Sequence, residues 1–247
     1  MTITIDNKPC TCEPGENLLE IAARNGIRIP TLCHHEGLPG QACCRVCIVE
    51  VEIGGRKSFV TACIYPVEQE CTVYTSNENV LQQRRMVLRL LRSLAPQSDE
   101  VARLCEEYGA LEYDRFIGKT DGKCILCSLC VSACRSLGTG AIGTAGRGVT
   151  KKVTTPYDEP SLACVGCASC ASVCPTGCIE VTYDEGKRQI WNKTFPMVAC
   201  KSCGTVIGTK MELWRAAQKL GSNETPELCE ACRKKAIADV LAATYGV

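Results

Sequence analysis

Hydrophobic and polar residues alternate along the first part of the chain in a pattern typical of a small β-rich domain. The segments TITI and PCTCEP, joined by a DNK turn, predict a two-stranded hairpin. ENLLEIAARNG then has apolar residues at helical spacing and stops at Gly26, which predicts a short helix. VCIVEVEI and KSFVTACIYPV predict two more strands around Gly54 and Gly55. Residues 1–77 are therefore expected to form one domain of strands with a single helix.

The pattern becomes helical in residues 78–112. An apolar stripe that ends before Pro96 predicts the first helix, with Val80, Leu81, Val87, Leu88, Leu91 and Leu94 on one side. Ser98 is placed to cap a second helix, which has acidic residues in its first turn and a stop at Gly109. We expect a helical connector whose basic residues, such as the pair Arg84 and Arg85, face solvent.

Cysteine is the unusual feature of the composition, with 22 residues in a chain of 247. The opening residues MTITIDNKPC lack the basic segment followed by an apolar one that marks export, so a cytoplasmic location is expected. In that reducing compartment, cysteine clusters bind metals more often than they form disulfides. Arg89 and Arg92 interrupt the most apolar helix, so no direct membrane span is expected, and a net charge of +1 gives no electrostatic case for nucleic acid.

Two cysteine runs share the spacing C-x2-C-x2-C-x3-C and carry the strongest chemical signal. In 4Fe-4S proteins with this spacing, three cysteines hold one cluster and the fourth reaches a second cluster. We therefore expect Cys134 and Cys174 to exchange partners. One 4Fe-4S cluster would take Cys124, Cys127, Cys130 and Cys174, and the other would take Cys164, Cys167, Cys170 and Cys134. A structural zinc site is built from two C-x2-C pairs, so the third and fourth cysteines of such a run would have no role in it.

Four earlier cysteines, spaced C-x10-C-x2-C-x15-C, predict a 2Fe-2S cluster held by Cys33, Cys44, Cys47 and Cys63. The first follows the predicted helix and the others border two predicted strands, so one long loop can close over a flat cluster. The spacing differs from the plant-type run C-x4-C-x2-C, and a zinc site is the alternative. Cys43 competes with Cys44, but the two-residue gap to Cys47 favours Cys44.

Two C-x2-C pairs near the end of the chain predict a further metal site, held by Cys200, Cys203, Cys229 and Cys232. Zinc is the favoured ion, while a rubredoxin-like iron centre or a further 4Fe-4S cluster has the same number of ligands. KMELWRAAQKLG between the pairs predicts a helix, hence a small zinc-ribbon-like or treble-clef-like module that docks on a partner. Cys178 belongs to no set and is expected to pack near a cluster.

Several of these motifs together resemble a known family: PTLCHHEGL, ACCRVCIVEV, GKCILCSLCVSACR, GAIGTAGRG and CVGCASCASVCPTG. They are similar to the N-terminal part of the complex I large iron–sulfur subunit, and more so to the iron–sulfur diaphorase subunit of NAD-reducing hydrogenases and NAD-linked formate dehydrogenases. The resemblance covers about residues 1–185. It implies a β-grasp 2Fe-2S domain joined to a two-cluster ferredoxin-like domain. Together with the hydrophobic pattern and the C-terminal cysteine pairs, this predicts an α+β fold with the 2Fe-2S domain in 1–77, a helical connector in 78–112, the two-cluster domain in 113–187 and the zinc-ribbon-like module in 188–247.

One departure from the family is visible. Between the two cluster domains the family usually has a 4Fe-4S cluster held by one histidine and three cysteines. The only histidines here are His34 and His35, and Cys105 is the only cysteine of the connector. We therefore expect that cluster to be absent, and we expect the two histidines to shape the 2Fe-2S loop through hydrogen bonds.

The sequence shows no nucleotide fingerprint and no nucleophile beside a base, so no catalytic residue is expected. A nicotinamide exchanges two electrons and a cluster one, so a flavin or another two-electron carrier must stand between them. The chain is expected to be an electron-transfer subunit between a flavin- and NAD(P)-binding diaphorase subunit and a hydrogenase subunit, with formate dehydrogenase second. A free-standing multi-cluster carrier and a zinc-dependent scaffold without redox function are the alternatives.

Overall fold

The computed structural model describes residues 1–110 and 121–246, and the chain divides into two compact units. The first unit is Met1–Ser132 with Val173–Cys178, and the second is Ala133–Ser172 with Ile179–Val247. These units differ from the four domains expected from the sequence, which remain predictions. The expected boundary between residues 112 and 113 lies outside the described residues.

The first unit contains a five-stranded sheet. Its strands and turn are β1 Thr2–Ile5, β2 Lys8–Thr11, β3 Glu16–Asn17, β4 Ile48–Ile53, β5 Arg56–Thr61, η1 Ala62–Ile64, β6 Pro66–Val67 and β7 Thr72–Tyr74. The sheet order is β2-β1-β7-β4-β5, with β3 and β6 paired separately. The hairpins β1–β2 and β4–β5 confirm the sequence prediction. The central strand β7, parallel to β1 and antiparallel to β4, was missed because three residues are too few to show alternation.

A hydrophobic core lies between this sheet and helix α1, Leu18–Arg24. Alternate residues of the strands point into it, as the period of two requires, and include Ile3, Ile5, Val49, Val51 and Val73. The Asn17 side chain caps α1 by accepting from the Leu19 N–H at 2.9 Å. The short helix predicted within ENLLEIAARNG is therefore confirmed.

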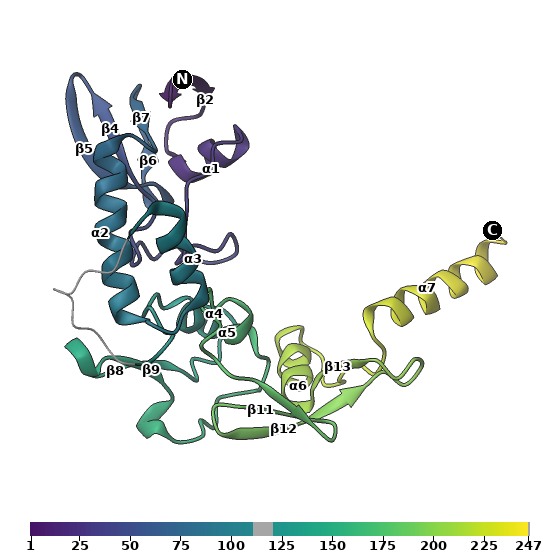
Figure 1. Cartoon of the computed structure of the whole chain (residues 1–247). Coiled ribbons are helices and arrows are strands. Elements are labelled where there is room, and N and C mark those ends of the chain that lie inside the picture. Colours follow the sequence, from purple (N-terminus) through teal and green to yellow (C-terminus); the bar gives the residue numbers. More distant parts are fainter. Residues whose placement is uncertain (111–120, 247) are drawn as a thin grey trace. The chain divides into compact units, whose positions relative to one another are not determined.

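Two helices form the connector, α2 Glu78–Leu94 and α3 Asp99–Tyr108. Asn77 caps α2, and Ser98 caps α3 as expected, with Gly109 in the left-handed conformation ending it. Helix α2 lies beside β4 (Figure 1). A second core joins both helices to the cysteine loops of the first unit, so the connector is part of the packing around those loops.

Only one residue of the basic pair on α2 is partly exposed to solvent. The expectation that both face solvent was wrong for Arg84. This residue is 1% exposed. Its guanidinium donates to the carbonyl oxygens of Val46 at 3.0 Å, Ile48 at 2.7 Å and Thr75 at 3.1 Å. The Tyr108 ring centre lies 5.0 Å from the guanidinium carbon. The start of β4 and the end of β7 supply carbonyls that need donors, which no pattern within α2 can reveal.

The second unit begins within helix α4, Leu129–Ser136. Its further elements are β8 Gly143–Ala145, η2 Gly148–Thr150, β9 Lys152–Thr154, η3 Pro156–Asp158, α5 Ser169–Ser172, β10 Thr182–Asp184, β11 Lys187–Ile190, β12 Lys193–Ala199, β13 Val206–Thr209, α6 Lys210–Lys219 and α7 Glu230–Tyr245. Strands β10 to β13 form an antiparallel sheet in sequence order (Figure 1). Helix α6 confirms the helix expected between the two C-x2-C pairs. Within the described ranges, no helix is both long and apolar enough to cross a membrane.

Candidate metal centres

The four cysteines expected at the 2Fe-2S cluster lie in the first unit, around the start of β4. Cys44 and Cys47 come just before that strand, and Cys63 lies in η1 after β5. All four are buried, with exposed fractions of 1% to 5% for Cys33, Cys44, Cys47 and Cys63. Side-chain hydrogen bonds join their thiols as two pairs, Cys33 with Cys44 and Cys47 with Cys63. Two pairs of thiols suit the two irons of a 2Fe-2S cluster.

The structure separates Cys44 from its competitor Cys43. Cys43 is exposed, and its thiol points to the carbonyl oxygen of Gln41 at 3.3 Å. The Cys44 N–H donates to the sulfur of Cys33 at 3.3 Å, and the hydrogen bond between the two thiols lowers the pKa of Cys44 to about 6. Nearby, the Nδ1 of His35 accepts from the Gly37 N–H at 3.1 Å, so this histidine shapes the loop as expected.

Three cysteines of the first 4Fe-4S run lie in the first unit together with Cys174, the last cysteine of the second run. Cys124, Cys127 and Cys174 are close enough for their charges to interact. Burial raises the pKa of Cys127 to about 11, so this thiol must lose a proton to bind iron. The fourth expected ligand of this set, Cys130, is also buried.

A fifth thiol lies at the same place. The sulfur of Cys178 is 3.5 Å from that of Cys174, and its side chain is also hydrogen-bonded to Cys124. This agrees with the expectation that Cys178 packs near a cluster. Direct contact with two expected ligands was not foreseen, because Cys178 stands outside both spaced runs.

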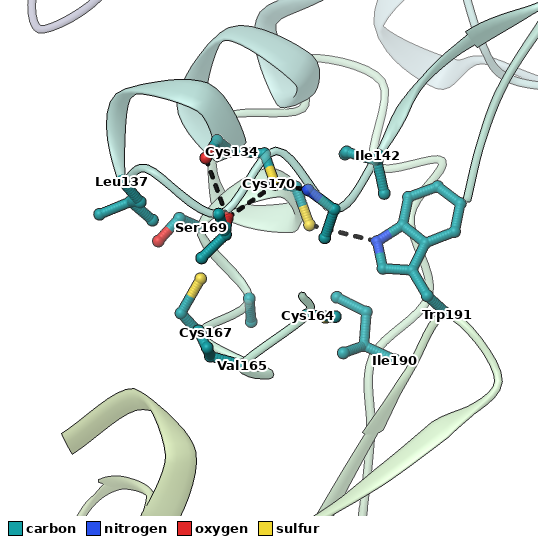
Figure 2. A pocket seen from close by; sticks show the side chains of 13 residues that line it. Cys134, Leu137, Ile142, Cys164, Val165, Cys167, Ser169, Cys170, Ile190 and Trp191 are labelled. Carbon is teal, nitrogen blue, oxygen red and sulfur yellow. Dashed lines mark hydrogen bonds between the residues drawn. The ribbon is translucent and has the colours of Figure 1, made fainter. Parts of the chain in front are cut away.

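The other four cysteines line one pocket of the second unit (Figure 2). Cys134 comes from the last turn of α4, whereas Cys164 and Cys167 lie in the loop before α5 and Cys170 lies within α5. The remaining walls are largely apolar and include Leu137, Ile142, Val165, Ile190 and Trp191. An apolar pocket with four thiols in its wall fits an iron–sulfur cluster, which is held by cysteine thiolates and shielded from water.

Two N–H donors point at the sulfurs of this pocket. The Ala141 N–H donates to Cys134 at 3.2 Å, while the Thr139 hydroxyl lies 3.0 Å from the same sulfur and donates to the Cys134 carbonyl oxygen at 2.9 Å. The indole N–H of Trp191 donates to Cys170 at 3.4 Å (Figure 2). Burial raises the pKa of Cys170 to about 11, and the indole hydrogen bond opposes that rise. Such donors stabilise the thiolate form that a cluster requires.

The sulfur atoms of the four C-terminal cysteines lie close together. The sulfurs of Cys200, Cys203, Cys229 and Cys232 all lie within 4.8 Å of one another, and those of Cys203 and Cys229 are 3.7 Å apart. A tetrahedral ion with bonds of about 2.3 Å to sulfur separates its ligands by about 3.8 Å. Hydrogen bonds from the N–H groups of Cys229 and Cys203 lower the pKa of Cys200 to about 6. This donor set therefore fits one zinc or iron ion better than a four-iron cluster.

Comparison with known proteins matches both types of cluster domain. The family described as "2Fe-2S iron-sulfur cluster binding domain" matches residues 1–78, and the family described as "4Fe-4S dicluster domain" matches residues 119–181. The NADP-reducing hydrogenase subunit HndD of Solidesulfovibrio fructosivorans is 36% identical over an alignment of 211 residues, and the match covers 72% of this chain and 36% of that protein. The chain is a homologue of this hydrogenase subunit. The motif-based resemblance is thereby confirmed.

Two further proteins widen the comparison. The NADPH-Fe(3+) oxidoreductase subunit alpha of Geobacter sulfurreducens is 30% identical over an alignment of 229 residues, and the match covers 83% of this chain and 27% of that protein. A chain of the NAD+-reducing NiFe-hydrogenase in its H2-reduced state aligns with a TM-score of 0.61 at 26% identity, covering 72% of this chain and 85% of that one. The present chain thus spans about a third or less of its two curated relatives.

Proposed function

We propose that this chain relays single electrons between a flavin- and NAD(P)-binding subunit and a second redox subunit, most plausibly a hydrogenase and otherwise a formate dehydrogenase. One observation carries the proposal: buried cysteines of two different sites share one hydrophobic core, since Cys33 and Cys44 pack in the same cluster of side chains as Cys127. The charges of Cys44 and Cys127 also interact. A packed core keeps two such sites at a fixed separation, which electron transfer between clusters requires.

The ligand sets are proposed as the sequence predicted them, with a β-grasp domain around the 2Fe-2S cluster. The exchange of Cys134 and Cys174 between runs is supported by the division of the chain, because Cys174 belongs to the first unit and Cys134 to the second. The bound clusters would supply one-electron carriers. The protein contributes neutral buried thiols that must lose protons on loading, and N–H donors that favour the charged form.

The C-terminal site is proposed to hold a single zinc ion. The 3.7 Å separation of two of its sulfurs supports one ion, and four cysteines in two C-x2-C pairs are a common structural zinc set. A rubredoxin-like iron centre is the competing occupant. With 22 cysteines and no disulfide among the described residues, we also propose that the protein works in a reducing cytoplasm.

Purification of the chain from its host, with metal and sulfide analysis, tests the function. We expect co-elution with a flavoprotein, about ten iron and ten sulfide per chain from one 2Fe-2S and two 4Fe-4S clusters, and about one zinc. NAD(P)H added to the complex should reduce the clusters. A monomer that shuttles electrons between separate enzymes would instead establish a free carrier, and zinc without iron would establish a scaffold.

The exchange of ligands is tested with Cys134→Ser and its matched control Cys130→Ser. Spectra of the reduced protein should show damage to the second 4Fe-4S cluster in the first variant and to the first 4Fe-4S cluster in the second variant. Loss of the same cluster in both variants would mean that each run holds its own cluster and that the proposed sets are wrong.

A further inference from the structure

The loop before α5, which carries Cys164 and Cys167 of the second 4Fe-4S site, is held by residues outside the matched dicluster domain. One side chain from each of β11, β12 and β13 donates to a carbonyl oxygen of this loop: Arg188 to Gly166 at 2.6 Å, Lys193 to Cys164 at 3.0 Å and Thr209 to Val165 at 2.5 Å. The family match ends at residue 181, so all three donors follow it. These C-terminal strands are therefore part of the housing of the second site.

The loop also lies directly against an aromatic ring. Phe195 of β12 is 1% exposed, and a Cβ atom added at Gly166 would stand 2.5 Å from its ring. Gly166 has a φ of +74°, which glycine adopts without cost. The close approach fixes the position of the loop relative to β12 and to the turn that precedes it.

That turn carries Trp191. The pairing of Ile190 with Lys193 leaves Trp191 and Asn192 as a two-residue hairpin turn, with φ values of +53° and +56°. Such turns favour asparagine and glycine, and a bulky residue in the left-handed region strains the backbone. Backbone strain of this kind is most often retained where a side chain has a task. Here the strained backbone directs the indole N–H to the sulfur of Cys170 (Figure 2).

We propose that Trp191 sets the reduction potential of the second 4Fe-4S cluster through its hydrogen bond to Cys170. The inference rests on the proposed function, since it requires that cluster. Reduction adds one electron, and part of the added negative charge falls on the ligand sulfurs. A donor at the sulfur therefore stabilises the reduced state more than the oxidised state and raises the potential. Trp191 acts through Cys170 and is a positioning residue, not a redox group.

The test is Trp191→Phe in the full chain with its clusters loaded, followed by a redox titration monitored by EPR. The phenyl ring keeps the apolar wall and removes the N–H. We expect the reduction equilibrium of the second cluster to become about three- to tenfold less favourable, where tenfold corresponds to about 59 mV for a one-electron couple. The other two clusters should keep their potentials. Trp214→Phe is the matched control, because Trp214 on α6 is 52% exposed and should affect no cluster.

A second measurement decides the case in which Trp191→Phe loses iron. The chain has two tryptophans, so ¹⁵N-indole labelling of the wild-type chain and of the Trp214→Phe variant isolates one indole. Pulsed EPR of the reduced second cluster should then detect coupling to the Trp191 nitrogen. No coupling, or an unchanged potential in a fully loaded Trp191→Phe protein, overturns the role of Trp191 alone. Absence of the second cluster from the wild-type chain would instead overturn the proposed function.

Discussion

Replacement of the buried Arg84 by methionine should weaken the 2Fe-2S region far more than the same change at Arg85. Methionine fills much of the space of the aliphatic part of the Arg84 side chain. It leaves the carbonyls of Val46, Ile48 and Thr75 without the guanidinium N–H groups that now donate to them. Each unsatisfied buried carbonyl costs about 1–3 kcal/mol. Burial also lowers the pKa of Arg84, because removing its charge from water costs free energy. The methionine variant has no buried charge and avoids this cost, which offsets part of the loss. The net loss should be about 3 kcal/mol, or roughly a hundredfold in the unfolding equilibrium.

Arg85 provides the comparison within the same helical turn. It donates to the Tyr108 carbonyl at 3.0 Å and pairs with Glu78 at 3.0 Å, with about a third of its side chain exposed. Such partly solvated contacts are worth about 1 kcal/mol or less. Because cluster loss makes unfolding irreversible, the assay is the rate at which the visible circular dichroism of the 2Fe-2S cluster disappears in urea. We expect at least tenfold faster loss for Arg84→Met than for Arg85→Met. Equal rates would refute the reasoning.

Three further outcomes follow from the geometry. Gly166→Ala should lose about four iron per chain, because the added Cβ meets the Phe195 ring. Gly177→Ala is the control: it has the same left-handed strain, but its Cβ meets no atom of the described residues within 4 Å, so it should keep its iron. Cys178→Ala should retain the full iron content, and a loss of about four iron would make Cys178 a ligand. Cys203→Ser should release about one zinc with iron unchanged, and a loss of iron instead would identify the ion as iron.

The sequence was most informative where function depends on local spacing. Cysteines two or three residues apart predict a ligand set because the chain itself brings them together, and the predicted cap at Ser98 is equally local. The strand β7 and the inward direction of Arg84 depend on contacts with distant segments. Trp191 was missed for the same reason, since only the fold brings the β11–β12 turn to Cys170. A lone tryptophan shortly after a two-cluster motif was the only signal available, and its neighbours gave it no meaning.

The division of the chain has a consequence for genetic dissection of the protein. The segment Val173–Cys178 returns to the first unit after forty residues that belong to the second. With the ligand sets proposed above, no continuous fragment that ends before residue 174 can complete the first 4Fe-4S site. No fragment that starts after residue 134 can complete the second. The two cluster sites are thus inseparable at the level of the gene, so truncation or domain transfer must carry residues 124–174 as one piece.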